Sequence, residues 1–426
     1  MAPRRFGRCL ASGMACVAGL LLASAPAEAA NFFRSASSAQ NGAGSTSLAI
    51  NKPAGVVAGD VMIAAVGANG NTSITAPAGW SAAGLYDAAS WSNTGWIQVV
   101  FKVAGSSEPA SYSWGLGTTR AGAGTIVDYI GVDNAAPVQT SAVGTGTASP
   151  AVAPTITTAS ANQMVLASVG GRNTTGAFTF TNPAGTTDRV GVYSSTGTPR
   201  AGIDSADSIQ AAAGATPTRS FTIAPTTTEW AGITIGLKPN TTGTLAFDVP
   251  PDAPALSAVA LNGQAQTTNA TMGGVTVSDT TGSTPGTGSG WNVTVVGDAS
   301  AGKSAVFKQY CNSGSACNGG ADPANSYVTG GRTLPAGSLK LNSTGASWTT
   351  SGGTGTPTFQ CSSGCSVDAA SATKITSAAA NSGRGAWKTS GFSATSLALS
   401  TPTTMRVLPA NEVYRADLVW SLNSGP

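Results

Sequence analysis

Histidine is missing from this 426-residue sequence, which removes the commonest general base of enzymes and the commonest metal ligand. A Gly-x-Ser-x-Gly turn is also missing, and Ser371-Ala-Thr-Lys374 lacks the Ser-Asp-Asn motif that accompanies a Ser-x-x-Lys nucleophile. Beyond residue 29 the only glutamates are Glu108, Glu229 and Glu412. We therefore predict no catalytic residues, no enzyme activity and no cofactor; the alternative is a hydrolase whose carboxylate pair forms only on folding.

Charged residues are scarce, at 9% of the chain. Beyond residue 29 the sequence has 18 basic and 17 acidic residues, a net charge of +1. This near-neutral balance excludes nucleic acid and anionic membranes as main partners, because both are bound through strongly basic surfaces. Asp204 and Asp207 are close enough in sequence to touch a calcium ion, but we expect them in a loop and predict no metal site.

Long apolar runs are missing beyond the first 29 residues, so we expect no membrane span after that point. Residues 1–29 combine a basic start, an apolar run over residues 17–23 and the small-x-small sequence Ala27-Glu-Ala29. These features predict a signal peptide and a secreted protein. The Arg4-Arg5 pair fits both the general and the twin-arginine export routes, and no lipid or covalent wall anchor is expected.

Cysteine is rare, and beyond the predicted signal peptide only four cysteines remain, in the C-terminal half. Export to an oxidising compartment favours disulfides. Of the three connectivities we prefer the short loops Cys311 to Cys317 and Cys361 to Cys365. A four-thiolate zinc site is the alternative, disfavoured by the spacing and by the missing histidine.

Glycine and proline are plentiful, with 55 and 23 residues, and they separate short apolar runs at regular intervals. This pattern predicts an all-β protein. A disordered stalk is the competing interpretation, but the aromatic residues fall within strand-like runs and supply enough apolar surface for a core. We predict two β-sandwich domains, residues 31–238 and 243–426, with residues 239–242 as the linker.

The N-terminal half repeats its own motifs. Residues 59–67 are echoed by residues 162–170, and residues 124–127 by residues 232–235. This predicts an internally duplicated, jelly-roll-like β-sandwich domain. Through motifs such as Pro77-Ala-Gly-Trp80, it also resembles a β-rich module of unknown function that recurs in secreted bacterial and phage-associated proteins.

Four tryptophans of the N-terminal half allow two interpretations. Trp80, Trp91, Trp96 and Trp114 could line a sugar-binding face or be buried. Alternation in residues 96–102 places apolar side chains on both sides of one strand, which favours burial on both faces.

Five segments of the C-terminal half occur in an order that resembles the WxL domain, a bacterial surface module. They are residues 243–247 (Gly-Thr-Leu-Ala-Phe), 275–279 (Val-Thr-Val-Ser-Asp), Gly290-Trp291, 334–339 (Leu-Pro-Ala-Gly-Ser-Leu) and Tyr414 followed by Trp420-Ser-Leu422. The resemblance implies non-covalent attachment to Gram-positive peptidoglycan or another wall glycan. Val293 stands where the family pattern has leucine.

The wall-motif residues Trp291, Trp420 and Leu422 are the candidate binding residues. Alternation places Trp291 and Val293 on one face of a strand, and Leu418, Trp420 and Leu422 on one face of another. The indoles are then either core anchors or platforms on which a glycan stacks.

The expected function follows from these observations. We predict an exported protein of the cell wall or extracellular surface, attached non-covalently through its C-terminal half, with an N-terminal half for binding or display. Neighbouring surface proteins are further candidate partners. The alternative is a secreted carbohydrate-binding protein or adhesin that uses the N-terminal aromatic residues.

Overall fold

A computed structural model describes residues 30–426 apart from 43, 71–72, 83–84, 86–88, 91–94, 197, 227, 241, 253, 283–287, 313 and 315. Regular structure there is almost entirely β-strand in antiparallel sheets, with one short 3-10 helix, η1 (Asn318–Gly320). The predicted all-β fold is confirmed. The predicted signal peptide, with Cys9 and Cys16, lies outside the described residues. No helix in the described part of the chain is long and apolar enough to cross a membrane.

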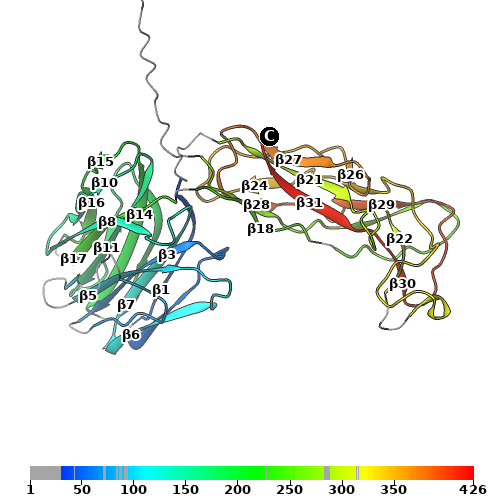
Figure 1. Ribbon diagram of the computed structural model, residues 1–426. Coiled ribbons are helices and arrows are strands. Elements are labelled where there is room, and N and C mark those ends of the chain that lie inside the picture. The colour runs from blue at the N-terminus through cyan, green and yellow to red at the C-terminus, as the bar shows by residue number, and fades with distance from the viewer. Residues whose placement is uncertain are drawn as a thin grey trace, which may run out of the picture.

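The N-terminal half, residues 31–238, contains two large sheets (Figure 1). The first has the order β1 (Phe32–Gln40), β7 (Gly122–Ile130), β3 (Val61–Asn69), β5 (Gly95–Val103), β4 (Ala89–Ser90). The second has the order β8 (Val138–Gly146), β17 (Glu229–Leu237), β11 (Gln163–Asn173), β14 (Arg200–Gln210), β13 (Thr187–Tyr193). The echoed segments fall on β3 and β11, and on β7 and β17, at the same positions of the two orders. This correspondence favours the predicted duplication.

Three smaller sheets complete the N-terminal half. They pair β2 (Ser45–Asn51) with β6 (Ser111–Arg120), β10 (Thr157–Thr158) with β15 (Gly214–Ala215), and β16 (Arg219–Ala224) with both β12 (Thr179–Thr181) and β9 (Ala151–Ala153).

The two large sheets pack against each other, and a smaller sheet covers the outer side of each. Ile63 of β3 and Ile233 of β17 belong to the core between the large sheets. Trp114 of β6 packs on the outer face of the first sheet, and Phe221 of β16 on that of the second. Each large sheet is therefore apolar on both faces, which explains why all nine residues of β3 are buried.

The predicted alternation of residues 96–102 is visible in β5. Ile97 and Val99 point into the core between the large sheets, whereas Trp96 and Val100 pack on the side that β2 and β6 cover. The strand is therefore buried on both faces, as its sequence indicates.

The C-terminal half, residues 243–426, consists of shorter strands. One sheet has the order β18 (Leu245–Val249), β20 (Thr276–Asp279), β28 (Gly385–Ser390), β24 (Ser347–Thr349). A second has the order β19 (Gln266–Ala270), β29 (Leu397–Thr401), β23 (Leu339–Leu341), β26 (Cys365–Ser366). A third has the order β25 (Thr358–Phe359), β27 (Thr373–Ala378), β21 (Trp291–Gly297), β31 (Leu418–Ser424), and β22 (Lys308–Cys311) pairs with β30 (Glu412–Arg415). One hydrophobic core, which includes Trp291, Trp348 and Trp387, joins strands of the three four-stranded sheets.

A buried contact joins the two halves. Phe32 at the start of β1 packs with Ala386 of β28, and the Arg384 guanidinium lies 5.0 Å from the centre of the Phe32 ring. Arg189 of β13 lies over the ring of Phe33 at 4.1 Å and donates a hydrogen bond to the Ser351 carbonyl at 3.2 Å. Both halves therefore contribute side chains to one continuous interface.

A charged cluster lies within this contact, centred on Arg34 of β1. The Arg34 guanidinium contacts Asp60 at 2.9 Å, Asp128 at 3.7 Å and Asp248 of β18 at 2.6 Å, and donates to the Ser278 hydroxyl at 3.1 Å. All four charged side chains are at most 7% exposed. One cation thus faces three buried carboxylates, and burial raises the pKa of Asp60 to about 6 and that of Asp128 well above its usual range.

Candidate functional site

The first motif tryptophan, Trp291, begins β21 and lies inside the C-terminal core. Its side chain is fully buried, its indole N–H donates to the Gly383 carbonyl at 2.9 Å, and its ring meets Trp348 edge to face at 5.5 Å. Gly383 has a φ of 74°, and a Cβ there would lie 2.5 Å from the indole nitrogen. Only glycine therefore allows this close approach, and Trp291 has no surface on which a sugar could stack.

The second motif tryptophan, Trp420, lies on the edge strand β31, next to β21. Antiparallel pairing places it opposite Val295 and places Leu422 opposite Val293. Trp420 and Leu422 pack against the core, but both are only half-buried. The structure therefore brings the two motif strands together, and Trp420 is the motif indole that keeps part of its surface exposed.

Two other segments of the resemblance meet at a pocket of about 370 Å³. The first contributes Leu334, and the second contributes Tyr414 of β30, 80 positions later in the chain. The pocket is lined by Arg332, Thr333, Leu334, Pro402, Thr404, Met405, Arg406 and Tyr414. Figure 1 shows β22 and β30 at the end of the C-terminal half that is far from the N-terminal half. The N-terminal half therefore does not cover this pocket.

The charge of the pocket is positive. Arg332 and Arg406 line it, no acidic residue does, and neither arginine forms a salt bridge with a carboxylate of the described residues. Arg332 donates one hydrogen bond to the Val407 carbonyl at 3.3 Å. Burial raises the pKa of the Tyr414 phenol, although the Arg332 charge opposes the shift, so the phenol stays protonated at neutral pH.

Sequence reasoning identified Tyr414 and Leu334 as parts of the resemblance but did not identify the two arginines. Arg332 and Arg406 are 74 positions apart in segments without a recognisable motif. The low overall charge of the chain was the available signal, and it does not indicate that two particular cations share a pocket.

The two disulfides have the predicted connectivity. Cys311 is bonded to Cys317 and Cys361 to Cys365, with Cα separations of 5.8 and 5.2 Å. This excludes a four-thiolate zinc site. Disulfides are typical of proteins that fold in an oxidising compartment.

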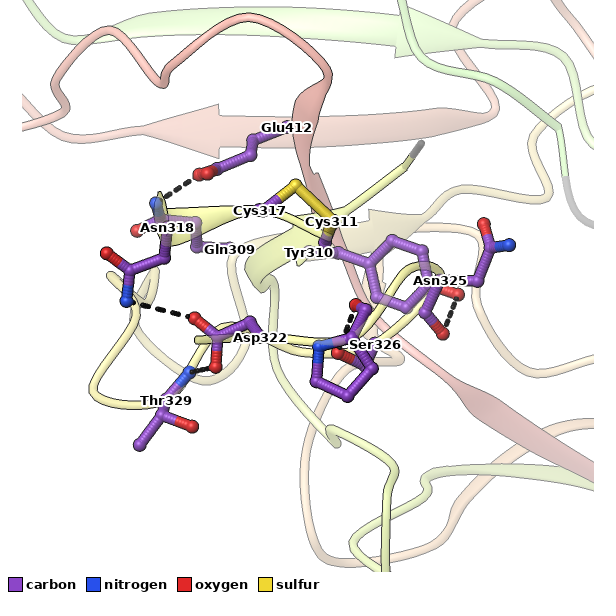
Figure 2. The surroundings of a disulfide bond; sticks show 11 residues. Gln309, Tyr310, Cys311, Cys317, Asn318, Asp322, Asn325, Ser326, Thr329 and Glu412 are labelled. Carbon is purple, nitrogen blue, oxygen red and sulfur yellow. Dashed lines mark hydrogen bonds between the residues drawn. A yellow bond between two sulfur atoms is a disulfide. The ribbon is translucent and has the colours of Figure 1, made fainter. Parts of the chain in front are cut away.

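Figure 2 shows that the first disulfide closes a loop at the end of β22. Within this loop region Asp322 is buried and accepts hydrogen bonds from the Thr329 backbone N–H at 3.0 Å and from the Asn318 amide at 3.1 Å. These bonds lower the pKa of the Asp322 carboxyl. Since Cys311 pairs with Glu412 of β30, the disulfide also fixes the strand pair that carries Tyr414.

Replacing Cys361 and Cys365 together by alanine should lower the free energy of unfolding by about 2 kcal/mol, because the unfolded chain gains the freedom of one short loop. Chemical denaturation of both proteins, with and without reducing agent, measures the effect. Reducing agent should lower the stability of the unmodified chain more than that of the variant, which retains only the Cys311 to Cys317 bond. An equal response of the two proteins would show that the second disulfide does not contribute.

The N-terminal tryptophans pack mainly into the protein. Trp114 is fully buried, and Trp80 lies half-buried with its ring 5.1 Å from Tyr112 and 5.4 Å from Trp114. Trp96 is also half-buried, and Trp91 lies outside the described residues. The described indoles therefore cover the outer face of the first sheet instead of forming an open platform.

Asp204 and Asp207 are not in a loop, so that part of the prediction was wrong. Both are buried within β14, because their side chains find polar partners inside the fold. Asp204 accepts a hydrogen bond from the Tyr193 hydroxyl, and Asp207 accepts from the Tyr129 hydroxyl and forms a salt bridge with Arg189 at 2.9 Å. Three positions apart on a strand, they point to opposite faces and cannot share a cation.

The remaining chemistry-bearing side chains are dispersed. Glu108 pairs with Lys102 and Tyr112, Glu229 with Arg172, and Glu412 with Gln309. Among the described residues no group of three or more histidine, cysteine, aspartate or glutamate side chains is placed to hold a metal ion.

No protein-family model, curated protein or solved structure matches this chain.

Proposed function

We propose that this chain is an exported bacterial surface protein that attaches non-covalently to peptidoglycan through a WxL-like C-terminal half. The observation that carries the proposal is the pocket at the far end of that half. Two segments of the resemblance, which contain Leu334 and Tyr414, line it together, and the strand of Trp420 follows Tyr414 directly. Two of the five segments that resemble the wall module thus line one positively charged pocket.

The chemistry of a wall polymer suits this surface. Peptidoglycan combines uncharged sugars with short peptides that end in carboxylates, so a ligand of this kind is mainly neutral with isolated negative charges. The chain has a net charge of +1 beyond residue 29, and two arginines line the pocket. This charge distribution suits a ligand with isolated negative charges and does not suit a polyanion.

Export is supported by the features of residues 1–29 and by the two disulfides. We propose that the N-terminal half serves for binding or display and that the protein is not an enzyme. The rival function, an adhesin that binds sugars on N-terminal aromatic residues, is less favoured because Trp114 and most of Trp80 are packed within the fold.

The test is a pelleting experiment with the chain from residue 30 onward and purified Gram-positive peptidoglycan freed of accessory polymers. We expect the protein to sediment with the peptidoglycan in a saturable manner. Chitin, a related glycan without peptides, serves as the control and should leave most of the protein in the supernatant. Equal binding to both polymers would favour the sugar-binding adhesin, and no binding to peptidoglycan would refute wall attachment.

A further inference from the structure

The pocket of Arg332, Arg406 and Tyr414 carries hydrogen-bond donors that the fold does not use. A guanidinium has five N–H donors. Arg332 donates one of them to the Val407 carbonyl at 3.3 Å, and neither arginine has a carboxylate partner among the described residues. Elsewhere in the described structure, arginines such as Arg34 and Arg189 are paired with aspartate. Two unpaired guanidiniums beside one pocket therefore indicate a site for an anion.

Tyr414 adds a neutral donor to the same pocket. Its phenol stays protonated at neutral pH, so the hydroxyl can donate one hydrogen bond to a ligand. Half-buried on β30, the ring is held by pairing of its backbone with Gln309 of β22. The strand pair thus fixes the backbone of Tyr414, whose side chain lines the pocket together with Arg332.

The rest of the lining restricts the shape of the ligand. The buried Leu334 and the half-buried Met405 form the apolar part of the lining, and the volume of about 370 Å³ is near the lower limit for small-molecule sites. A polyanion would need a stripe of basic residues, but the pocket holds only two, in a half with few charges. One anionic group next to a small apolar group fits this arrangement.

We infer that this pocket binds the free carboxylate and the adjoining methyl group of an alanine-terminated wall peptide. The two guanidiniums hold the carboxylate oxygens, Tyr414 donates a third hydrogen bond, and Leu334 and Met405 contact the methyl group. The inference rests on the proposed function, since it names the part of peptidoglycan that the C-terminal half recognises.

Titration calorimetry of the chain from residue 30 onward with N-acetyl-D-alanyl-D-alanine tests the site directly. The C-terminal amide of the same dipeptide keeps the methyl groups but lacks the charge. It should bind roughly tenfold or more weakly, because it loses charge-assisted hydrogen bonds. Glycerol 3-phosphate serves as the second probe and represents the phosphates of teichoic acids.

Two double variants distinguish binding at this pocket from a general effect of lost positive charge. Arg332→Gln with Arg406→Gln should weaken dipeptide binding roughly tenfold or more. Lys374→Gln with Lys388→Gln removes the same charge from exposed positions on β27 and β28 and should leave binding unchanged. Thermal melts of both variants should match the unmodified protein, because none of the four side chains is buried.

The outcomes distinguish this inference from wall attachment itself. The inference is supported if the arginine variant, but not the lysine variant, loses both dipeptide binding and peptidoglycan pelleting. If the unmodified protein pellets with peptidoglycan but does not bind the dipeptide, the wall function stands and the inference is overturned. Tighter binding of glycerol 3-phosphate than of the dipeptide would also overturn it and assign the pocket to phosphate.

Discussion

Replacing Trp291 by alanine should lower the free energy of unfolding of the C-terminal half by about 3–5 kcal/mol. The indole is fully buried, packs edge to face with Trp348, and donates its N–H to the Gly383 carbonyl. The substitution leaves a large cavity beside Trp348 and removes the indole N–H that the Gly383 carbonyl accepts. Denaturant unfolding followed by intrinsic fluorescence measures the loss.

Trp420→Ala is the matched comparison, since it removes the same side chain from the adjacent strand. Trp420 is half-buried on an edge strand, so the cost should be clearly smaller than at Trp291. Trp291→Phe, which keeps an aromatic ring, should also cost less than Trp291→Ala. Equal losses for the two alanine variants would contradict the distinction between a core indole and an edge indole.

Replacing Arg34 by methionine should cost about 3–5 kcal/mol at neutral pH, because it leaves three buried carboxylates without their cation. The loss should affect both halves, since Arg34 of β1 contacts Asp248 of β18. Lys238→Met is the control. Lys238 is 43% exposed and pairs with Asp133 at 2.7 Å, so its removal should cost less than about 1 kcal/mol.

The pH dependence of the Arg34 variant gives a second readout. In the native protein the pKa of Asp60 is raised to about 6, so the folded state binds this proton more tightly than the unfolded chain does. The contribution of Asp60 to stability is therefore present below its ordinary pKa and is lost as pH rises to about 6. Without the Arg34 charge the pKa values of Asp60 and Asp128 rise further, so the variant should lose stability over a wider range toward high pH. A variant whose deficit is the same at about pH 4 and about pH 8 would contradict this cause.

Patterns within one strand were sufficient to predict much of the fold. Alternation around Ile97 and Val99 indicated a strand buried on both sides, and the structure has that arrangement. The short spacings of the cysteines indicated both disulfides correctly. These predictions worked because each depends on residues only a few positions apart.

Features that depend on distant residues could not be predicted. Nothing near Arg34 in the sequence identifies Asp248 as a partner, and nothing near Arg332 identifies Arg406. The error at Asp204 and Asp207 has the same origin. Polar residues near glycine usually indicate a loop, but Tyr129 and Arg189, from other strands, satisfy Asp207 inside β14. The alternation of residues 418–422 predicted that Trp420 faces the core. It did not predict that its strand lies at the edge of a sheet, which determines how much of the indole is exposed.

The Arg34 cluster also makes burial at the start of β1 depend on residues of the C-terminal half. Arg34 is among the first described residues, but its partners Asp248 and Ser278 follow 214 and 244 positions later. Without the C-terminal half, Arg34 would lack Asp248 and Ser278, and Phe32 would lack its contact with Ala386. A chain interrupted between the halves would therefore present a charged and apolar face to other proteins.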